Sequence, residues 1–205
     1  IGSIALEDYA EDVERVLASE LVAASPAEDR IEPVVIGHDI GGVIALSLAR
    51  RRLCRAVIAL APPLPGTIAD EYRDILRRSR RWLGRALAPP VALPGEPSFD
   101  ASRLQPDSVL AARALLHPRR APEPPEVAAL VVAGDRDPLV ERDALAEAAR
   151  GLGADFAERA AAHWGLEDAG FERHVDQLHR WLVKRLGADL LRLTGSEDLD
   201  DDEQP

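Results

Sequence analysis

The chain has little of what several common classes of protein require. Its 205 residues include no methionine and one cysteine, Cys54, and acidic residues outnumber basic ones, giving a formal net charge of −11. A lone cysteine cannot form an internal disulfide, so Cys54 is expected to be a small buried side chain at the start of a strand. The negative charge argues against nucleic acid and anionic membranes as partners.

Long hydrophobic runs are also missing. No apolar stretch approaches the roughly 18 residues that a membrane-spanning helix needs, and the N-terminus lacks the basic segment and apolar block of a secretory signal. We therefore expect no membrane partner and a cytoplasmic location. Because the sequence starts at Ile1, it is expected to be either processed or an N-terminally incomplete reading of a longer polypeptide.

What is present is the composition of an ordinary globular protein. The chain is 46% hydrophobic and 30% charged, which suits one core with a small additional segment better than two full domains. Acidic side chains gather at the C-terminal end, and we expect residues 187–205 to form a disordered acidic tail.

Short apolar strands alternate with amphipathic helices along the chain. The spacing of apolar residues predicts helices over 6–21, from the end of the first strand to about 51, over 145–152 and over 171–186. The strands are predicted over 31–36, 55–60, 127–133 and 155–159. Such alternation predicts an α/β fold with a mainly parallel sheet and flanking helices.

Prolines interrupt this pattern in the middle of the chain. The stretch 63–125 contains most of them and one convincing helix, Ala69 to Leu87, so we interpret it as a helical lid inserted into the core. The core is then expected in two parts, residues 1–62 and 126–186.

One short motif carries most of the functional information. The glycine-rich sequence Gly37-His38-Asp39-Ile40-Gly41-Gly42 lies between a β-branched run and an apolar helix, which indicates a strand, a tight turn and a helix. In such a turn the central residue is held in a strained conformation with its side chain lifted off the sheet, and small neighbours let strand and helix approach. The lifted residue here is Asp39.

With two later motifs, this turn resembles the nucleophile elbow of the α/β-hydrolase family. The later motifs are the stretch from Gly134 to Val140, which contains Asp137, and Ala162-His163-Trp164-Gly165. The resemblance covers roughly Leu6 to Leu186 and implies Asp39 as nucleophile, Asp137 as triad acid and His163 as base. By this resemblance, the family's N-terminal strands are absent here, which favours the expectation that the sequence is an N-terminally incomplete reading of a longer polypeptide.

A carboxylate nucleophile implies particular chemistry. It is ionised at neutral pH and suits attack on an sp³ carbon, giving an ester that His163, oriented by Asp137, hydrolyses with water. The backbone N–H of Ile40 would then stabilise the oxyanion. Attack of Asp39 on an ester carbonyl would give a high-energy anhydride, so serine-esterase chemistry is disfavoured. Aspartate-nucleophile relatives are epoxide hydrolases and haloalkane dehalogenases, and the substrate is expected to be a small molecule.

The markers of these two subclasses are incomplete. Dehalogenases usually have a tryptophan after the nucleophile, where this chain has Ile40, and epoxide hydrolases usually have two lid tyrosines, where this chain has only Tyr72. Trp82 is a second candidate lid contact, although its helical spacing from Tyr72 favours packing. Asp135 competes with Asp137 as the triad acid, and the family's pattern favours Asp137.

Several interpretations stay open at this point. The chain could be a non-catalytic or incomplete relative, a serine-esterase-like member that has lost its serine, or a binding module that uses its basic lid helix or acidic tail. His38 is expected to be structural, packed beneath the turn. No histidine or cysteine pair stands at ligand spacing near Asp135 and Asp137, so neither metal nor cofactor is expected. The sequence leaves the oligomeric state open.

Overall fold

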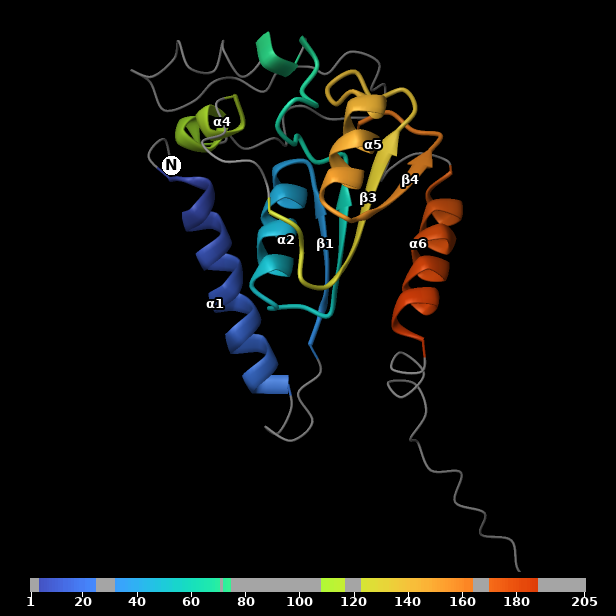
Figure 1. Ribbon diagram of the computed structural model, residues 1–205. Helices are drawn as coiled ribbons and strands as arrows, with labels where there is room; N and C mark the ends of the chain where they lie inside the picture. Colours follow the sequence, from blue (N-terminus) through green and yellow to red (C-terminus); the bar gives the residue numbers. More distant parts are fainter. Residues whose placement is uncertain are drawn as a thin grey trace, which may run out of the picture.

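The computed structural model describes residues 4–24, 32–70, 72–74, 108–116, 123–163 and 170–187 (Figure 1). Helices and strands alternate through most of these residues. In chain order they are α1 (Leu6–Ala24), β1 (Val34–His38), α2 (Ile40–Arg50), β2 (Ala56–Leu60), α4 (Val109–Leu116), β3 (Ala128–Gly134), α5 (Arg142–Gly151), β4 (Asp155–Arg159) and α6 (Phe171–Leu186). Among the described helices, none has the length and apolar character needed to cross a membrane.

The strands form one parallel sheet, as the sequence predicts. Their order is β1-β2-β3-β4, so neighbours in the sheet are also neighbours among the strands of the chain. In register, Ile36 of β1 lies beside Ile58 of β2, and Ile58 lies beside Leu130 of β3. Because all strands run in one direction, their carboxyl ends meet at the same edge of the sheet. The predicted α/β fold class is confirmed.

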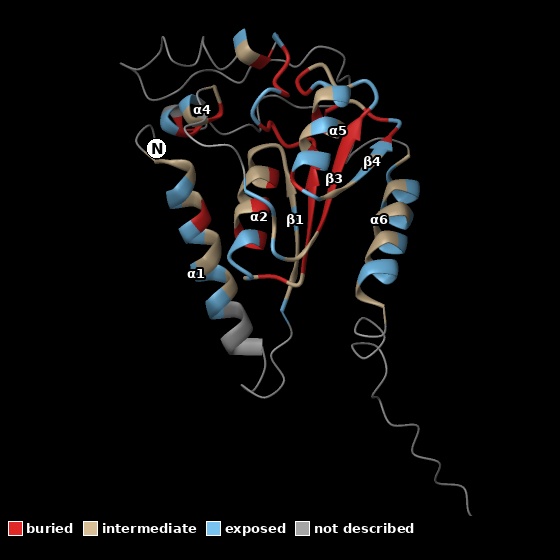
Figure 2. Cartoon of the chain, in the orientation of Figure 1, coloured by how far each residue is buried: buried red, intermediate tan, exposed pale blue. Residues whose placement is uncertain are grey.

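Helices cover both faces of this sheet (Figure 1). On one face, Val57 of β2 and Val131 of β3 pack in a core cluster that includes side chains of α2 and α5. On the other face, Ile58 and Leu130 pack against α6. Burial on both faces explains why β2 is apolar at every position instead of alternating, and Figure 2 shows β2 and β3 as the buried centre. The central strands therefore form a rigid base for the loops at their carboxyl ends.

Element boundaries differ from the sequence-based prediction in a few places. Strand β1 covers 34–38 and not 31–36, so it continues up to the residue before Asp39. Helix α1 extends to Ala24. Most of the lid helix predicted from Ala69 to Leu87 lies outside the described residues, although Tyr72 and its two successors are helical.

Helix α4 was not expected, because it lies within the proline-rich stretch. Two local signals favour it. The Ser108 hydroxyl accepts a hydrogen bond from the Leu110 N–H at 3.2 Å, as a helix-capping serine does. Ala111 and Leu115, four residues apart on one helical face, are both buried. A serine followed by an apolar pair at this spacing outweighs the nearby prolines.

Candidate active site

Asp39 occupies the turn between β1 and α2 in a strained conformation. Its φ is 53° and its ψ is −124°, a region that residues other than glycine rarely adopt. The turn is held from both sides, because the Asp39 N–H donates to the Leu60 carbonyl at 2.9 Å and the Asp39 carbonyl accepts from Gly42 at 2.9 Å. These bonds fix the backbone of Asp39 at the carboxyl end of the sheet.

The close approach of strand and helix at this turn requires glycine at one position above all. A Cβ on Gly37 would lie 2.1 Å from the carbonyl oxygen of Gly41, which no real contact tolerates. Gly42 is tight, with Pro62 Cβ at 3.1 Å. At Gly41 nothing lies within 4 Å, so the expectation that the turn needs small residues holds for Gly37 and Gly42 but not for Gly41.

Three side chains far apart in the sequence meet at this edge of the sheet. His163 Nδ1 lies 2.9 Å from Asp137 Oδ2, and both side chains are 1% exposed. The other ring nitrogen, Nε2, faces Asp39 with 3.8 Å to Oδ1. Since a carboxylate can only accept, Nδ1 carries the proton and the lone pair of neutral His163 is on Nε2. The structure therefore brings together the three residues that the motifs predict as a triad.

Asp137, and not Asp135, is the carboxylate at this histidine. The second oxygen of Asp137 accepts the backbone N–H groups of Leu139 at 2.8 Å and Val140 at 3.1 Å, so the whole carboxylate is held. Asp135 lies 3.5 Å from the guanidinium of Arg136, with its side chain 36% exposed. Of the two acids that the sequence offers, only Asp137 is hydrogen-bonded to His163.

Tyr72 also contacts the predicted nucleophile. Its hydroxyl lies 3.0 Å from Oδ1 and 3.1 Å from Oδ2 of Asp39, and the tyrosine side chain is buried. The ring of Tyr72 stands edge-on to the ring of His163 with 6.3 Å between centroids. Trp82, the other candidate lid contact, lies outside the described residues.

Ile40 is the first residue of α2 and follows Asp39 directly. The N–H groups in the first turn of a helix have no acceptor within the helix, and they carry the positive end of its dipole. This position at the start of α2 is compatible with the prediction that the Ile40 N–H stabilises negative charge beside Asp39, which stays a prediction.

Two further side chains reach His163 through its main chain. His38 Nε2 lies 2.8 Å from the His163 carbonyl oxygen, and the two imidazole rings are 4.8 Å apart. Arg159, buried at the end of β4, donates to the same carbonyl at 3.3 Å. Burial and the neighbouring His163 lower the pKa of His38 to about 4, so its ring is neutral at pH 7.

The sequence predicts only a packing role for His38 and no role for Arg159. The signal available for Arg159 was an arginine that ends a strand four residues before His163. A buried guanidinium needs acceptors close by, and the loop leading to His163 supplies one.

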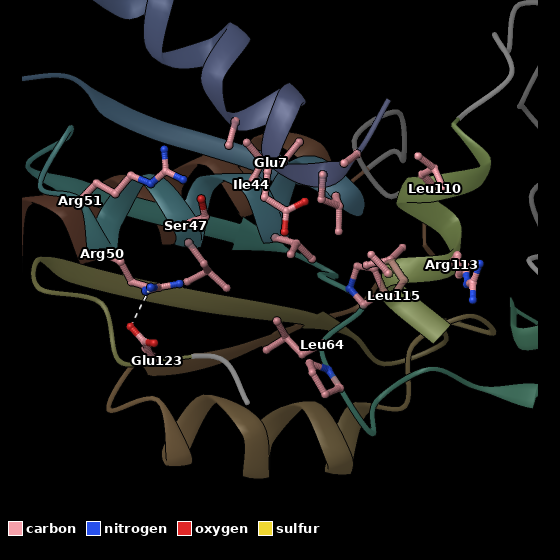
Figure 3. Close-up of a pocket in the computed structure, with 18 of the residues that line it drawn as sticks. Glu7, Ile44, Ser47, Arg50, Arg51, Leu64, Leu110, Arg113, Leu115 and Glu123 are labelled. Carbon is pink, nitrogen blue, oxygen red and sulfur yellow. Dashed lines mark hydrogen bonds and ion pairs between the residues drawn. The ribbon is translucent and has the colours of Figure 1, made fainter. Parts of the chain in front are cut away.

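The structure also has a cavity of about 970 Å³, and Figure 3 shows residues that line it. Residues of α1, α2, α4 and the loop after β2 line it, and two of the lining residues, Arg50 and Glu123, form an ion pair with 2.7 Å between nitrogen and oxygen. Neither Asp39 nor His163 is among its described lining residues.

Comparison with known families agrees with this architecture. The sequence model described as "Alpha/beta hydrolase family" matches residues 2–181. The chain therefore belongs to the α/β-hydrolase family. A sequence search among curated proteins finds no match.

Solved structures with the same fold include lipases and esterases. The monoacylglycerol lipase of Paleococcus ferrophilus is 15% identical, with a TM-score of 0.58 over 90% of this chain and 77% of that one. A soluble variant of monoglyceride lipase from Saccharomyces cerevisiae, in complex with a substrate analog, is 13% identical, with a TM-score of 0.66 over 90% and 71%. A thermophilic esterase from Thermogutta terrifontis is 17% identical, with a TM-score of 0.61 over 89% and 74%. Such likeness defines the fold of this chain.

Proposed function

We propose that this α/β-hydrolase-family protein hydrolyses an epoxide through a covalent ester on Asp39. The observation that carries the proposal is the position of Asp39 in the strained turn, with His163 Nε2 facing its carboxylate and Asp137 bound to His163 Nδ1. A carboxylate in that position needs no base to attack carbon, and the histidine stands ready for a later water molecule.

In the first step, a carboxylate oxygen of Asp39 attacks a ring carbon of the epoxide. A carbon–oxygen bond forms to Asp39, the ring carbon–oxygen bond breaks, and its electron pair stays on the ring oxygen. Tyr72 gives its hydroxyl proton to that oxygen, leaving a hydroxyalkyl ester on Asp39 and a phenolate on Tyr72. The hydroxyl of Tyr72 lies 3.0 Å and 3.1 Å from the two carboxylate oxygens, so it is close to any epoxide that Asp39 attacks.

In the second step, His163 Nε2 takes a proton from water as the water oxygen attacks the ester carbonyl of Asp39. Asp137 stabilises the imidazolium, and the N–H of Ile40 stabilises the oxyanion. The intermediate expels the diol oxygen, which takes the proton from His163. The new carboxyl group of Asp39 returns a proton to the Tyr72 phenolate, and the net reaction is epoxide plus water giving a diol.

Tyr72 also distinguishes between candidate leaving groups. A halide leaves without a proton and is stabilised by N–H donors, and the side chain of Ile40 offers none. An oxygen leaving group is stabilised when a donor protonates it, and the Tyr72 hydroxyl beside Asp39 is such a donor. An ester substrate would give an anhydride with Asp39. Among the residues that the structure describes, the groups beside Asp39 therefore favour an epoxide over a haloalkane or an ester.

The test follows the oxygen atom of water. In H₂¹⁸O, the first turnover should place ¹⁸O in the carboxylate of Asp39 and give unlabelled diol, because the diol oxygen comes from the aspartate. Terminal and styrene-type epoxides serve as probes, and mass spectrometry of the peptide that contains Asp39 is the measurement. In His163→Gln the ester should accumulate on Asp39. Label in the diol from the first turnover, or no adduct with any epoxide probe, would overturn the proposal.

The esterases and lipases among the solved structures support a second candidate, a serine-esterase-like member that has lost its serine. It makes a distinct prediction. Asp39→Ser should then gain hydrolysis of p-nitrophenyl butyrate, and the unaltered protein should neither hydrolyse this ester nor form an ester with epoxides.

A further inference from the structure

The main-chain carbonyl of His163 accepts two hydrogen bonds from side chains. His38 Nε2 is 2.8 Å away and Arg159 Nη2 is 3.3 Å away. A carbonyl oxygen has two lone pairs, so these two donors can occupy both. Arg159 is buried, and the ring of His38 also packs on the ring of His163 at 4.8 Å. The backbone of His163 is therefore fixed independently of its imidazole.

The two donors come from opposite edges of the described sheet. His38 ends β1 and Arg159 ends β4, with β2 and β3 between them. The segment from Arg159 to His163 thus crosses the carboxyl ends of the strands. It passes so close to β3 that a Cβ on Gly134 would lie 2.4 Å from the Ala161 carbonyl oxygen. That carbonyl accepts the Arg136 N–H at 3.2 Å, so the crossing segment is held to β3 before it reaches His163.

We propose that His38 and Arg159 are positioning residues for His163: by holding its carbonyl they set the reach of Nε2 toward Asp39. This rests on the proposed function, in which His163 is the base. Asp137 fixes one ring nitrogen, which still allows the ring to swing about that bond. When the main chain of His163 is fixed as well, its imidazole ring is restricted to one position. This restriction matters because misplacement of a reacting group by about 1 Å can cost about 10²-fold in rate.

The two histidines must hold opposite tautomers. The His163 carbonyl can only accept, so the proton of neutral His38 is on Nε2. Asp137 can only accept, so the proton of neutral His163 is on Nδ1. His38 therefore donates to the backbone of His163, while the Nε2 lone pair of His163 is left for the reaction.

This role has a kinetic signature. His163 acts as base only when water attacks the ester, whereas formation of the ester needs Asp39 and Tyr72. Loss of the His38 donor should therefore slow hydrolysis of the ester and leave its formation nearly unchanged. A general loss of stability would reduce the active fraction for both steps equally.

The matched variants are His38→Phe, which keeps a ring without a donor, and His38→Gln, which places an N–H at the reach of Nε2. In rapid-quench measurements with an epoxide, His38→Phe should slow ester hydrolysis about 10–100-fold with ester formation within about twofold. His38→Gln should restore most of the hydrolysis rate. Arg159→Met should produce the same selective effect, smaller because its hydrogen bond is longer.

A second measurement does not need activity. The Nδ1 proton of His163 bound to Asp137 should give a protected downfield NMR signal, which should broaden or shift in His38→Phe and return in His38→Gln. An unchanged signal in His38→Phe, or equal slowing of both steps, overturns the inference. Absence of any adduct in the unaltered protein and in His163→Gln overturns the proposed function instead. If His38→Phe does not fold, His38→Asn, whose amide is too short to reach the carbonyl, and Arg159→Met replace it in both measurements.

Discussion

The hydroxyl of Tyr72 bridges the two carboxylate oxygens of Asp39, at 3.0 Å and 3.1 Å. A phenol carries one proton, so these distances describe one hydrogen shared between two acceptors. The arrangement is nearly symmetric, and the hydroxyl therefore stays beside whichever oxygen becomes bonded to the substrate.

Tyr72→Phe should slow formation of the ester from an epoxide about 10²–10⁴-fold, the range typical of a lost proton donor. Hydrolysis of an ester already formed should change much less, because that step uses His163. Single-turnover kinetics separates the two rates. Tyr9→Phe on α1 is the matched control and should leave both unchanged. Equal effects of the two variants would contradict a chemical role for Tyr72.

Asp137→Asn should reduce ester hydrolysis by about 10²-fold or more, because an amide cannot stabilise the imidazolium of His163 and can favour the wrong tautomer. The matched control is Asp135→Asn, which also removes one negative charge. Asp135 pairs with Arg136 and not with His163, so this variant should leave the rate of ester hydrolysis within about twofold. Burst kinetics with adduct detection provides the comparison. If Asp135→Asn were the more damaging variant, the assignment of the triad acid would be wrong.

His38 should make the stability of the protein depend on pH. Its pKa is lowered from 6.5 to about 4 by burial, so between these values the unfolded chain binds a proton that the folded chain does not. The stabilising contribution of neutral His38 is complete above pH 6.5, is lost as the pH falls toward 4, and then levels off. The whole change is roughly 3 kcal/mol.

Urea unfolding of the unaltered protein and of His38→Gln, measured from pH 4 to pH 8, isolates this contribution. The difference in unfolding free energy between the two proteins should vary with pH only in the window from about 4 to 6.5. A constant difference across that window would mean that the His38 pKa is not lowered in the folded state.

The glycines of the turn should respond differently to alanine. Gly37→Ala places a Cβ 2.1 Å from the Gly41 carbonyl oxygen and should destabilise the protein by several kcal/mol or prevent folding. Gly41→Ala has open space within 4 Å and lies inside α2, where alanine gains up to about 1 kcal/mol over glycine. Thermal unfolding should therefore show opposite shifts for the two variants, and a rise for Gly37→Ala would contradict the close packing described here.

The sequence predicted the sheet and its edge because those features depend on local patterns. The apolar runs of β2 and β3 and the glycines around Asp39 are visible within short windows. Once all strands run parallel, Asp39, Asp137 and His163 must come to the same edge, since each follows the carboxyl end of a strand. This made the meeting of the three side chains foreseeable.

The contacts that refine the site were not foreseeable in the same way. Whether Tyr72 reaches Asp39 depends on how the segment after β2 folds back, and no periodicity encodes that path. The role of His38 depends on the loop after β4 crossing the sheet, which is a property of packing between distant segments. Likewise the prolines around residues 109–116 argue against a helix, whereas Ser108 at the start of α4 and the buried side chains Ala111 and Leu115 stabilise one.

Gly134 carries no group that could react, yet the Ala161 carbonyl oxygen stands 2.4 Å from where its Cβ would be. Any larger residue at position 134 would displace the backbone segment from Arg159 to His163, and the imidazole of His163 would move with that segment. The spacing between the proposed base and the proposed nucleophile thus depends in part on the absence of a Cβ at residue 134, so a substitution there should change the rate of the proposed reaction without touching the substrate.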